Sequence, residues 1–96
     1  MAALDPTIHQ PIRLSIMAAL MALEAREQMD FTSLRELVQA TDGNLGAHLQ
    51  KLEDAGYIAV EKTFVGRKPR TFVAVTVKGR HAFQQHVVAL REIIGG

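Results

Sequence analysis

Residues 31–80 read FTSLRELVQATDGNLGAHLQKLEDAGYIAVEKTFVGRKPRTFVAVTVKGR, and this stretch decides the fold. It holds two short amphipathic segments, separated by a polar break at residues 41–43, and then two strands rich in β-branched and aromatic residues. This order predicts a helix-turn-helix followed by a β-hairpin. The hairpin loop at residues 66–70, GRKPR, carries three cations in five residues. A helix able to enter a major groove, next to a cationic loop able to reach the neighbouring phosphates, points to duplex DNA.

The third helix of the chain should start around Gly43 and stop at Gly56, which can take the left-handed conformation that ends a helix. Its apolar residues recur at the spacing of one helical face, and they are Leu45, Leu49 and Leu52. That face should point to the core. The residues then left pointing outward are Asn44, Ala47, His48 and Lys51. Asp42 is expected to cap the helix, because a carboxylate satisfies free N–H groups there but would repel phosphate.

Local signals also place the second helix and the two strands. The second helix is expected to begin at Ser33, with Glu36 completing a capping box, and to end near Ala40. The strands are expected at residues 57–65 and 71–76, where β-branched and aromatic residues are frequent. The proline of the connecting loop should keep that loop out of the strand ladder.

One more helix is expected on each side of this stretch. Pro11 can occupy the first turn of a helix that runs to about Ala25, since proline lacks only an N–H that a helix start leaves unpaired. Thr76 can cap a last helix that continues to about Ile94. Both helices carry more apolar surface than one small core needs, so we expect them to join two copies of the chain. The expected dimer interface consists of Leu14, Met17, Met21, Phe83, Val87, Leu90 and Ile94. The opposite apolar face of the first helix is the alternative.

Composition indicates one small domain without disulfides. With 96 residues, 48% of them apolar, the chain can bury a single modest core, and association can add to its stability. Charges interrupt every apolar run well before the ~18 residues that a membrane span needs, and no signal-peptide pattern precedes the first helix. We therefore expect a cytoplasmic protein with no membrane partner. The absence of cysteine excludes disulfides, thiolate metal sites and a cysteine nucleophile.

A net charge of only +1 conceals a division along the chain. Residues 1–61 hold nine acids and four bases, a net charge of −5, whereas residues 62–96 hold seven bases and one acid, a net charge of +6. A lopsided solvated surface would be the simplest explanation of such a division. Because three of the cations share one loop, the pattern instead favours a polyanionic partner.

Three segments together resemble a known family: residues 45–58 (LGAHLQKLEDAGYI), 66–70 (GRKPR) and 76–80 (TVKGR). They are similar to the small winged-helix transcriptional regulators related to the MarR and ArsR families, most closely to the single-domain branch, and residues 12–14 fit the same pattern. The resemblance implies an α+β, mostly α, winged helix-turn-helix that spans residues 1–96 as a single domain. It also implies a homodimeric repressor whose third helix reads the major groove and whose wing touches phosphate or the minor groove. ArsR-type metal sensing relies largely on cysteine, which this chain lacks.

Seven residues are candidates for contact with DNA: Asn44, Ala47, His48, Lys51, Arg67, Lys68 and Arg70. Asn44 can bind adenine through N6 and N7, although asparagine near a helix start can equally be a cap. His48 can donate to a phosphate or a base edge, and Lys51 suits phosphate. The three loop cations fit the DNA backbone or the minor groove, and the alternative is that they only blunt the end of a hairpin.

Catalytic and metal-binding functions find little support in the sequence. His81 and His86 lie about 140° apart around a helix, so they cannot chelate one ion from the same face. The chain has no phosphate-binding glycine loop or nucleophile motif, and its carboxylates are scattered. We expect no enzyme activity, no metal and no cofactor, and the sequence leaves open whether an effector ligand exists. The rival hypothesis is a winged helix used as a protein-interaction module, which salt dependence of binding would distinguish from a DNA-binding domain.

Overall fold

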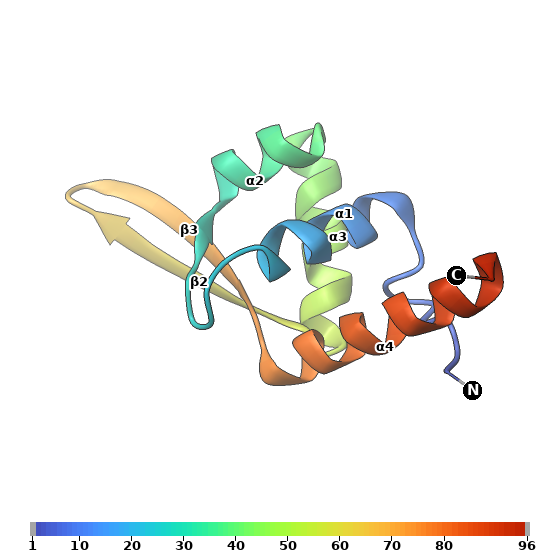
Figure 1. The fold of residues 1–96 in the computed structure, drawn as a ribbon. Coiled ribbons are helices and arrows are strands. Elements are labelled where there is room, and N and C mark those ends of the chain that lie inside the picture. The colour runs from blue at the N-terminus through green and yellow to red at the C-terminus, as the bar shows by residue number, and fades with distance from the viewer. Residues whose placement is uncertain (1, 96) are drawn as a thin grey trace.

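The computed structural model describes residues 2–95, which form four helices and a three-stranded antiparallel sheet. The elements in chain order are α1 (Pro11–Met21), β1 (Met29–Asp30), α2 (Phe31–Val38), α3 (Asp42–Asp54), β2 (Ile58–Val65), β3 (Lys68–Val75) and α4 (Val77–Ile94). Helices α1 to α3 form the body, while the β2–β3 hairpin projects from one end and α4 extends toward the other (Figure 1). The predicted winged helix-turn-helix is confirmed. In addition to the expected elements, the sheet contains β1.

The core is built around α1. Buried side chains from α1, α2, α3 and both hairpin strands meet the N-terminal segment there, and they are Ile8, Ile16, Met17, Leu20, Leu34, Leu45, Leu49, Leu52, Ile58 and Val73. Burying one such side chain contributes roughly 1.5–3 kcal/mol. Helix α1 packs against α2, α3 and β3 and also touches α4, which explains why its sequence is apolar almost all round. No helix within residues 2–95 is long and apolar enough to cross a bilayer.

The hairpin is longer and its turn shorter than the sequence predicts. Strands β2 and β3 pair along their whole length, and residues 66 and 67 alone make the turn, with Gly66 at φ +66° as a two-residue hairpin requires. Lys68, Pro69 and Arg70, expected in the loop, therefore belong to β3. Proline is tolerated in the strand because β1 pairs with β3 only at residues 72 and 73, which leaves the tip of β3 without a second neighbour.

Two helix boundaries differ from the prediction, and at each of them a side-chain carboxylate accepts a hydrogen bond from a backbone N–H group. Helix α1 ends at Met21, not near Ala25, and the Glu27 carboxylate accepts from the Glu24 N–H at 2.8 Å in the turn that follows. Helix α2 begins at Phe31, two residues before the predicted start at Ser33. Its N-cap is Asp30, whose carboxylate accepts from the Ser33 N–H at 3.3 Å, so the predicted capping box was wrong.

The ends of α3 and α4 follow the predicted chemistry with one exception. Thr41, not Asp42, caps α3, and its Oγ1 accepts from the Asn44 N–H at 3.1 Å. Gly56 follows the end of α3 at φ +79°, as predicted. Thr76 caps α4 as predicted, since its Oγ1 accepts from the Gly79 N–H at 3.0 Å.

The N-terminal segment is fastened to α4 and to the start of the hairpin by buried polar groups. The Asp5 N–H donates to His86 Nδ1 at 3.1 Å, and the Tyr57 hydroxyl donates to the Asp5 carboxylate. That hydrogen bond, with burial, raises the pKa of Tyr57 to about 12. His86 is fully buried, and burial together with the neighbouring His9 lowers its pKa. His81 is exposed, so the two histidines of α4 lie on different faces, as their spacing predicts.

A close approach of two backbones sets the position of α4. The Thr76 N–H donates to the Tyr57 carbonyl oxygen at 3.0 Å, and the Thr76 hydroxyl donates to the Gly56 carbonyl oxygen at 2.7 Å. A Cβ on Gly79 would lie 2.0 Å from the Tyr57 oxygen. Only glycine at position 79 therefore lets the first turn of α4 rest on the start of β2.

Replacing Gly79 with alanine should destabilise the protein by about 3 kcal/mol, because the methyl group meets a backbone that hydrogen bonds hold in place. The matched control is Gly46→Ala in α3, where a Cβ meets nothing within 4 Å and should stabilise the helix by about 0.5–1 kcal/mol. Urea unfolding of both variants measures the difference. Equal free energies of unfolding for the two would contradict the close approach.

Candidate nucleic-acid interface

Helix α3 presents an exposed polar face opposite its buried leucines. Leu45, Leu49 and Leu52 are at most 4% exposed, and the structure places Asn44, Ala47 and Lys51 on the exposed side, as the leucine spacing predicts. Because Thr41 supplies the oxygen that caps α3, the Asn44 side chain is not needed for capping. The capping role that was the alternative for Asn44 is thus filled by Thr41.

His48 lies on the same helix but is half-buried against α1. Its Nδ1 atom lies 3.1 Å from Nη1 of Arg13. Burial, and then the positive charge of Arg13, lower the pKa of His48, and both effects favour the uncharged ring. Arg13 of α1 was not predicted to contact a residue of α3. The available signal was that α1 carries a single charged residue, at position 13.

The start of α3 is neutralised by a neighbouring helix. Arg35 of α2 donates to the Asp42 carboxylate at 2.5 Å, which joins the two helices of the helix-turn-helix. The pair offsets the acidic charge closest to the exposed face of α3. No sequence pattern indicates this contact, because it depends on the angle between α2 and α3.

The three cations of the wing are not equivalent. All three are exposed, but Arg67 lies in the turn and Lys68 next to it, whereas Arg70 Nη1 lies 3.8 Å from the Asp30 carboxylate at the base of the wing. The hydrogen bond from the Ser33 hydroxyl, more than Arg70, lowers the pKa of Asp30. Arg70 is thus directed toward the body while the other two cations stay at the tip.

Two apolar side chains accompany the cations at the tip of the wing. Phe64 is 70% exposed and Val65 is 54% exposed. Sequence reasoning missed both, because β-branched and aromatic residues at these positions were used only as a signal for a strand. Exposed apolar groups next to cations suit a groove edge, where proteins insert apolar side chains between base steps.

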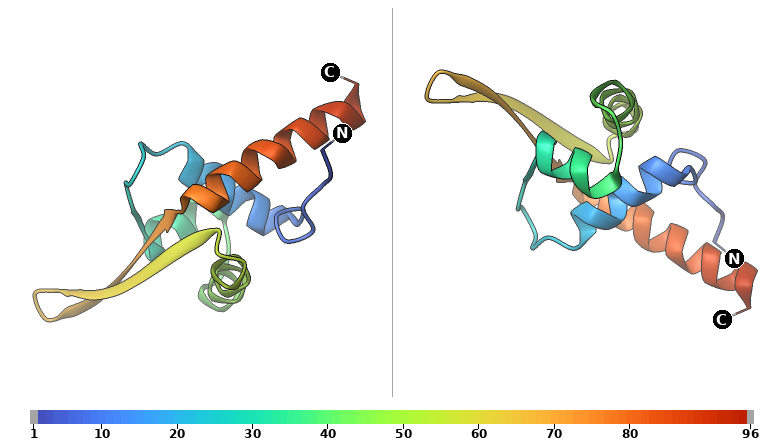
Figure 2. Two further views of the ribbon diagram at one scale, coloured as in Figure 1. Left: turned by 90° about the horizontal axis from the view of Figure 1, so that it is seen from below. Right: turned by 90° about the horizontal axis from the view of Figure 1, so that it is seen from above.

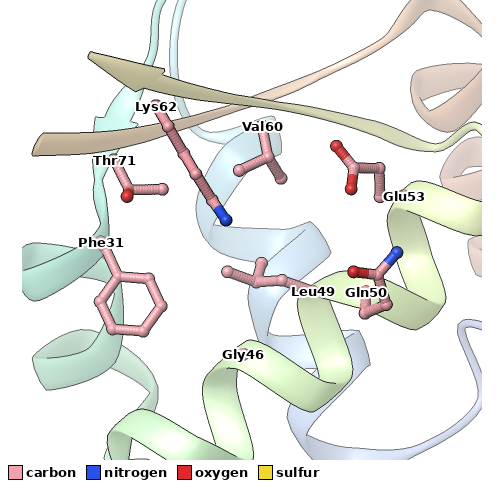
Figure 3. Close-up of a pocket in the computed structure, with 8 residues that line it drawn as sticks. All are labelled: Phe31, Gly46, Leu49, Gln50, Glu53, Val60, Lys62 and Thr71. Carbon is pink, nitrogen blue, oxygen red and sulfur yellow. The ribbon is translucent and has the colours of Figure 1, made fainter.

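A hollow of about 330 Å³ lies between α2, α3 and the sheet. It is lined by Phe31, Gly46, Leu49, Gln50, Glu53, Val60, Lys62 and Thr71 (Figure 3). The Lys62 amine reaches into it from β2, while Gln50 and Glu53 project from α3. Helix α3 and the hairpin lie on the same side of the molecule, with α1 and α4 behind them (Figure 2). A partner with a convex, negatively charged surface would be able to contact α3 and the hairpin at the same time.

The residues expected at a dimer interface divide into three groups. Met17 is fully buried in the core of the single chain and is not available to a partner, which corrects the prediction. Leu14 and Phe83 pack against the core, and Met21, Val87 and Leu90 are half-buried. Ile94 is 77% exposed, and its neighbour Ile93, which was not predicted, is 65% exposed. The pattern of α1 could not identify its buried face because both of its faces are apolar.

Residues 12–94 match the family model described as a winged helix DNA-binding domain. The chain belongs to this family. An uncharacterized protein of Methanocaldococcus jannaschii, MJ0432, is 35% identical over 82 residues, which cover 85% of this chain and 86% of that protein. The structure is similar to a transcriptional regulator homologue from Pyrococcus horikoshii, with a TM-score of 0.83 and 30% identity over 94% of this chain and 86% of the other.

A MarR-family transcriptional regulator from Silicibacter pomeroyi shares the fold, with a TM-score of 0.64 and 18% identity over 91% of this chain and 58% of that chain. The winged-helix domain is therefore MarR-like in architecture, as the sequence resemblance implied. Its family is one of DNA-binding domains, and the similar structures are those of transcriptional regulators. Within residues 2–95, no three metal-ligating side chains gather at one point.

Proposed function

We propose that this winged-helix domain acts as a homodimeric repressor, with α3 in the major groove and the wing on the backbone or in the minor groove. The observation that supports it most is that α3, with exposed polar residues, and the hairpin, with exposed cations at its tip, lie on the same side of the molecule (Figure 2). A helix inserted in a major groove brings an adjacent hairpin over the neighbouring phosphates. The positive charge of residues 62–96 strengthens attraction to that backbone.

Within this proposal, different side chains of α3 recognise the base sequence and bind the phosphate backbone. The Asn44 amide can pair with both N6 and N7 of adenine, whereas the Lys51 ammonium is a point charge suited to phosphate. Ala47, which lies between them on the exposed face, can approach a thymine methyl group. Neutralisation of Asp42 by Arg35 removes a repulsion that would otherwise oppose insertion of the helix N-terminus into the groove.

The dimer would form through α1 and α4, which carry more apolar surface than the core of one chain needs. Ile93 and Ile94 lie beyond the core at the end of α4, where a second copy could cover them. Two copies related by a two-fold axis would place their α3 helices in successive major grooves, with half-sites about 10 base pairs apart. A dimer bound to such a site would prevent other proteins from binding the same DNA, and this exclusion is sufficient for repression. The protein would act in the cytoplasm.

Replacing Arg67 and Lys68 with alanine should weaken binding to all duplexes by similar factors, because phosphate contacts carry no sequence information. The slope of log affinity against log salt should fall by about one unit for each phosphate that the variant no longer neutralises. The matched control is Arg91→Ala, which removes an exposed cation from the far end of α4. Fluorescence anisotropy over a range of salt measures both quantities. An unchanged slope in the double variant would place the wing off the DNA.

Asn44→Ala should lose about 1–3 kcal/mol of binding free energy on the preferred sequence and little on random DNA. Lys51→Ala should lose similar amounts on both, since phosphate is common to all sequences. Selection of bound sequences from random DNA supplies the preferred site, and anisotropy titrations compare it with a scrambled duplex. If both substitutions left both affinities unchanged in folded protein, α3 would not be the recognition helix, and a protein-interaction role would be favoured.

Replacing Ile93 and Ile94 with serine should shift the protein from dimer to monomer at micromolar concentration, because both side chains lie outside the core of the single chain. Val77→Ser is the control, since Val77 is also exposed but lies at the opposite end of α4. Sedimentation equilibrium distinguishes the states. A wild-type protein that is monomeric at this concentration would exclude the model with two half-sites.

A further inference from the structure

We propose that Arg13 is a positioning residue that fixes the tautomer of His48, so that α3 offers a neutral Nε2–H donor to a base edge. The inference rests on the proposed insertion of α3 into the major groove. It assigns His48 to the reading of sequence and not to the holding of phosphate. The sequence alone left both roles open.

The donor and acceptor capacities of the two side chains dictate the tautomer. An arginine guanidinium has five N–H donors, no acceptor, and a permanent charge. Its Nη1 lies 3.1 Å from His48 Nδ1, so Nδ1 must accept with its lone pair. The ring proton then resides on Nε2. The opposite tautomer, or a doubly protonated ring, would bring two N–H groups face to face.

Two further hydrogen bonds, one from its side chain and one from its backbone, hold Arg13 in place. Its Nε donates to the Thr7 carbonyl oxygen at 2.5 Å, and its backbone N–H donates at 2.8 Å to the Gln10 side chain that caps α1. Its side chain therefore bridges the N-terminal segment and the recognition helix. Helices α1 and α3 pack against each other, which keeps this bridge partly buried. A fixed donor on α1 is better able to enforce one tautomer than a mobile surface cation.

A neutral N–H donor can bind a base edge without adding to the salt dependence of binding. The N7 atom of purines, O6 of guanine and O4 of thymine all accept hydrogen bonds in the major groove. A neutral donor on a phosphate would release no counterion, so it would add little to the salt-dependent part of binding. The contact between Arg13 Nη1 and His48 Nδ1 disfavours a proton on Nδ1, and burial and Arg13 lower the pKa of His48 in the same direction.

Long-range ¹H–¹⁵N correlation spectra of the histidine rings test the tautomer in the full chain without DNA. We expect the His48 ring, assigned by its absence in His48→Gln, to show a protonated Nε2 and an unprotonated Nδ1 at pH 7. In Arg13→Met the ring should become a mixture of tautomers. A charged ring or a protonated Nδ1 in the wild-type protein would overturn the proposal, and so would an unchanged spectrum in Arg13→Met.

A double-mutant cycle on DNA tests whether Arg13 acts through His48. His48→Ala and Arg13→Met should each lower the affinity for the preferred sequence by about 3- to 10-fold, the range expected for one hydrogen bond. The double variant should lose no more than His48→Ala alone. His48→Gln, which carries an acceptor oxygen and an N–H donor on one untitratable group, should retain most of the affinity. Additive losses would show that Arg13 acts independently of His48, and equal losses on random DNA would show that His48 does not read sequence.

The ring spectra and the DNA titrations separate this proposal from the proposed function. If the wild-type protein failed to bind any duplex, the repressor hypothesis would fall, and base reading by His48 would fall with it. The ring spectra would still decide the positioning role of Arg13. If DNA binding were sequence-specific but His48→Ala left it unchanged, the proposed function would stand and base reading by His48 would be wrong.

Discussion

The burial of three leucines on one side of α3 is the constraint on which both the fold and the candidate interface depend. Leu45, Leu49 and Leu52 occupy the core beside α1, and each contributes roughly 1.5–3 kcal/mol by its burial. Rotating α3 to present another face would forfeit several of these contributions, a large share of the stability of a small domain. The helix is thereby committed to expose Asn44 and Lys51. The same helical periodicity therefore sets both the stability of the fold and the residues exposed at the candidate interface.

Elements with a long periodic pattern were predictable from the sequence, whereas features that depend on contacts between elements were not. The cap at Thr76 and the stop at Gly56 are local, and both are confirmed. Strand β1 has two residues, too few for any alternation, and it exists only because β3 lies beside it. Pro69 was placed in a loop because sequence does not show that the tip of β3 lacks a second neighbour.

The same distinction applies to the candidate site. The exposed positions of α3 followed from the leucine spacing, but the bond between Arg13 and His48 joins residues that are 35 positions apart. The pairing of Arg70 with Asp30 likewise could not be inferred from charge density, which made three wing cations look alike. Met17 was assigned to a dimer interface because a helix with two apolar faces carries no signal for which one is covered within its own chain.

The contact between α4 and the hairpin determines how a dimer would meet DNA. The first turn of α4 rests on the backbone at Tyr57, through a hydrogen bond from Thr76 and the absence of a side chain at Gly79. The same residue 57 lies between the end of α3 and the start of β2. A dimer joined at the far end of α4 would therefore hold both recognition helices and both wings at angles fixed by this junction. In the proposed dimer, the spacing of the two half-sites would then depend on this junction in each copy, although none of its residues is a candidate for contact with DNA.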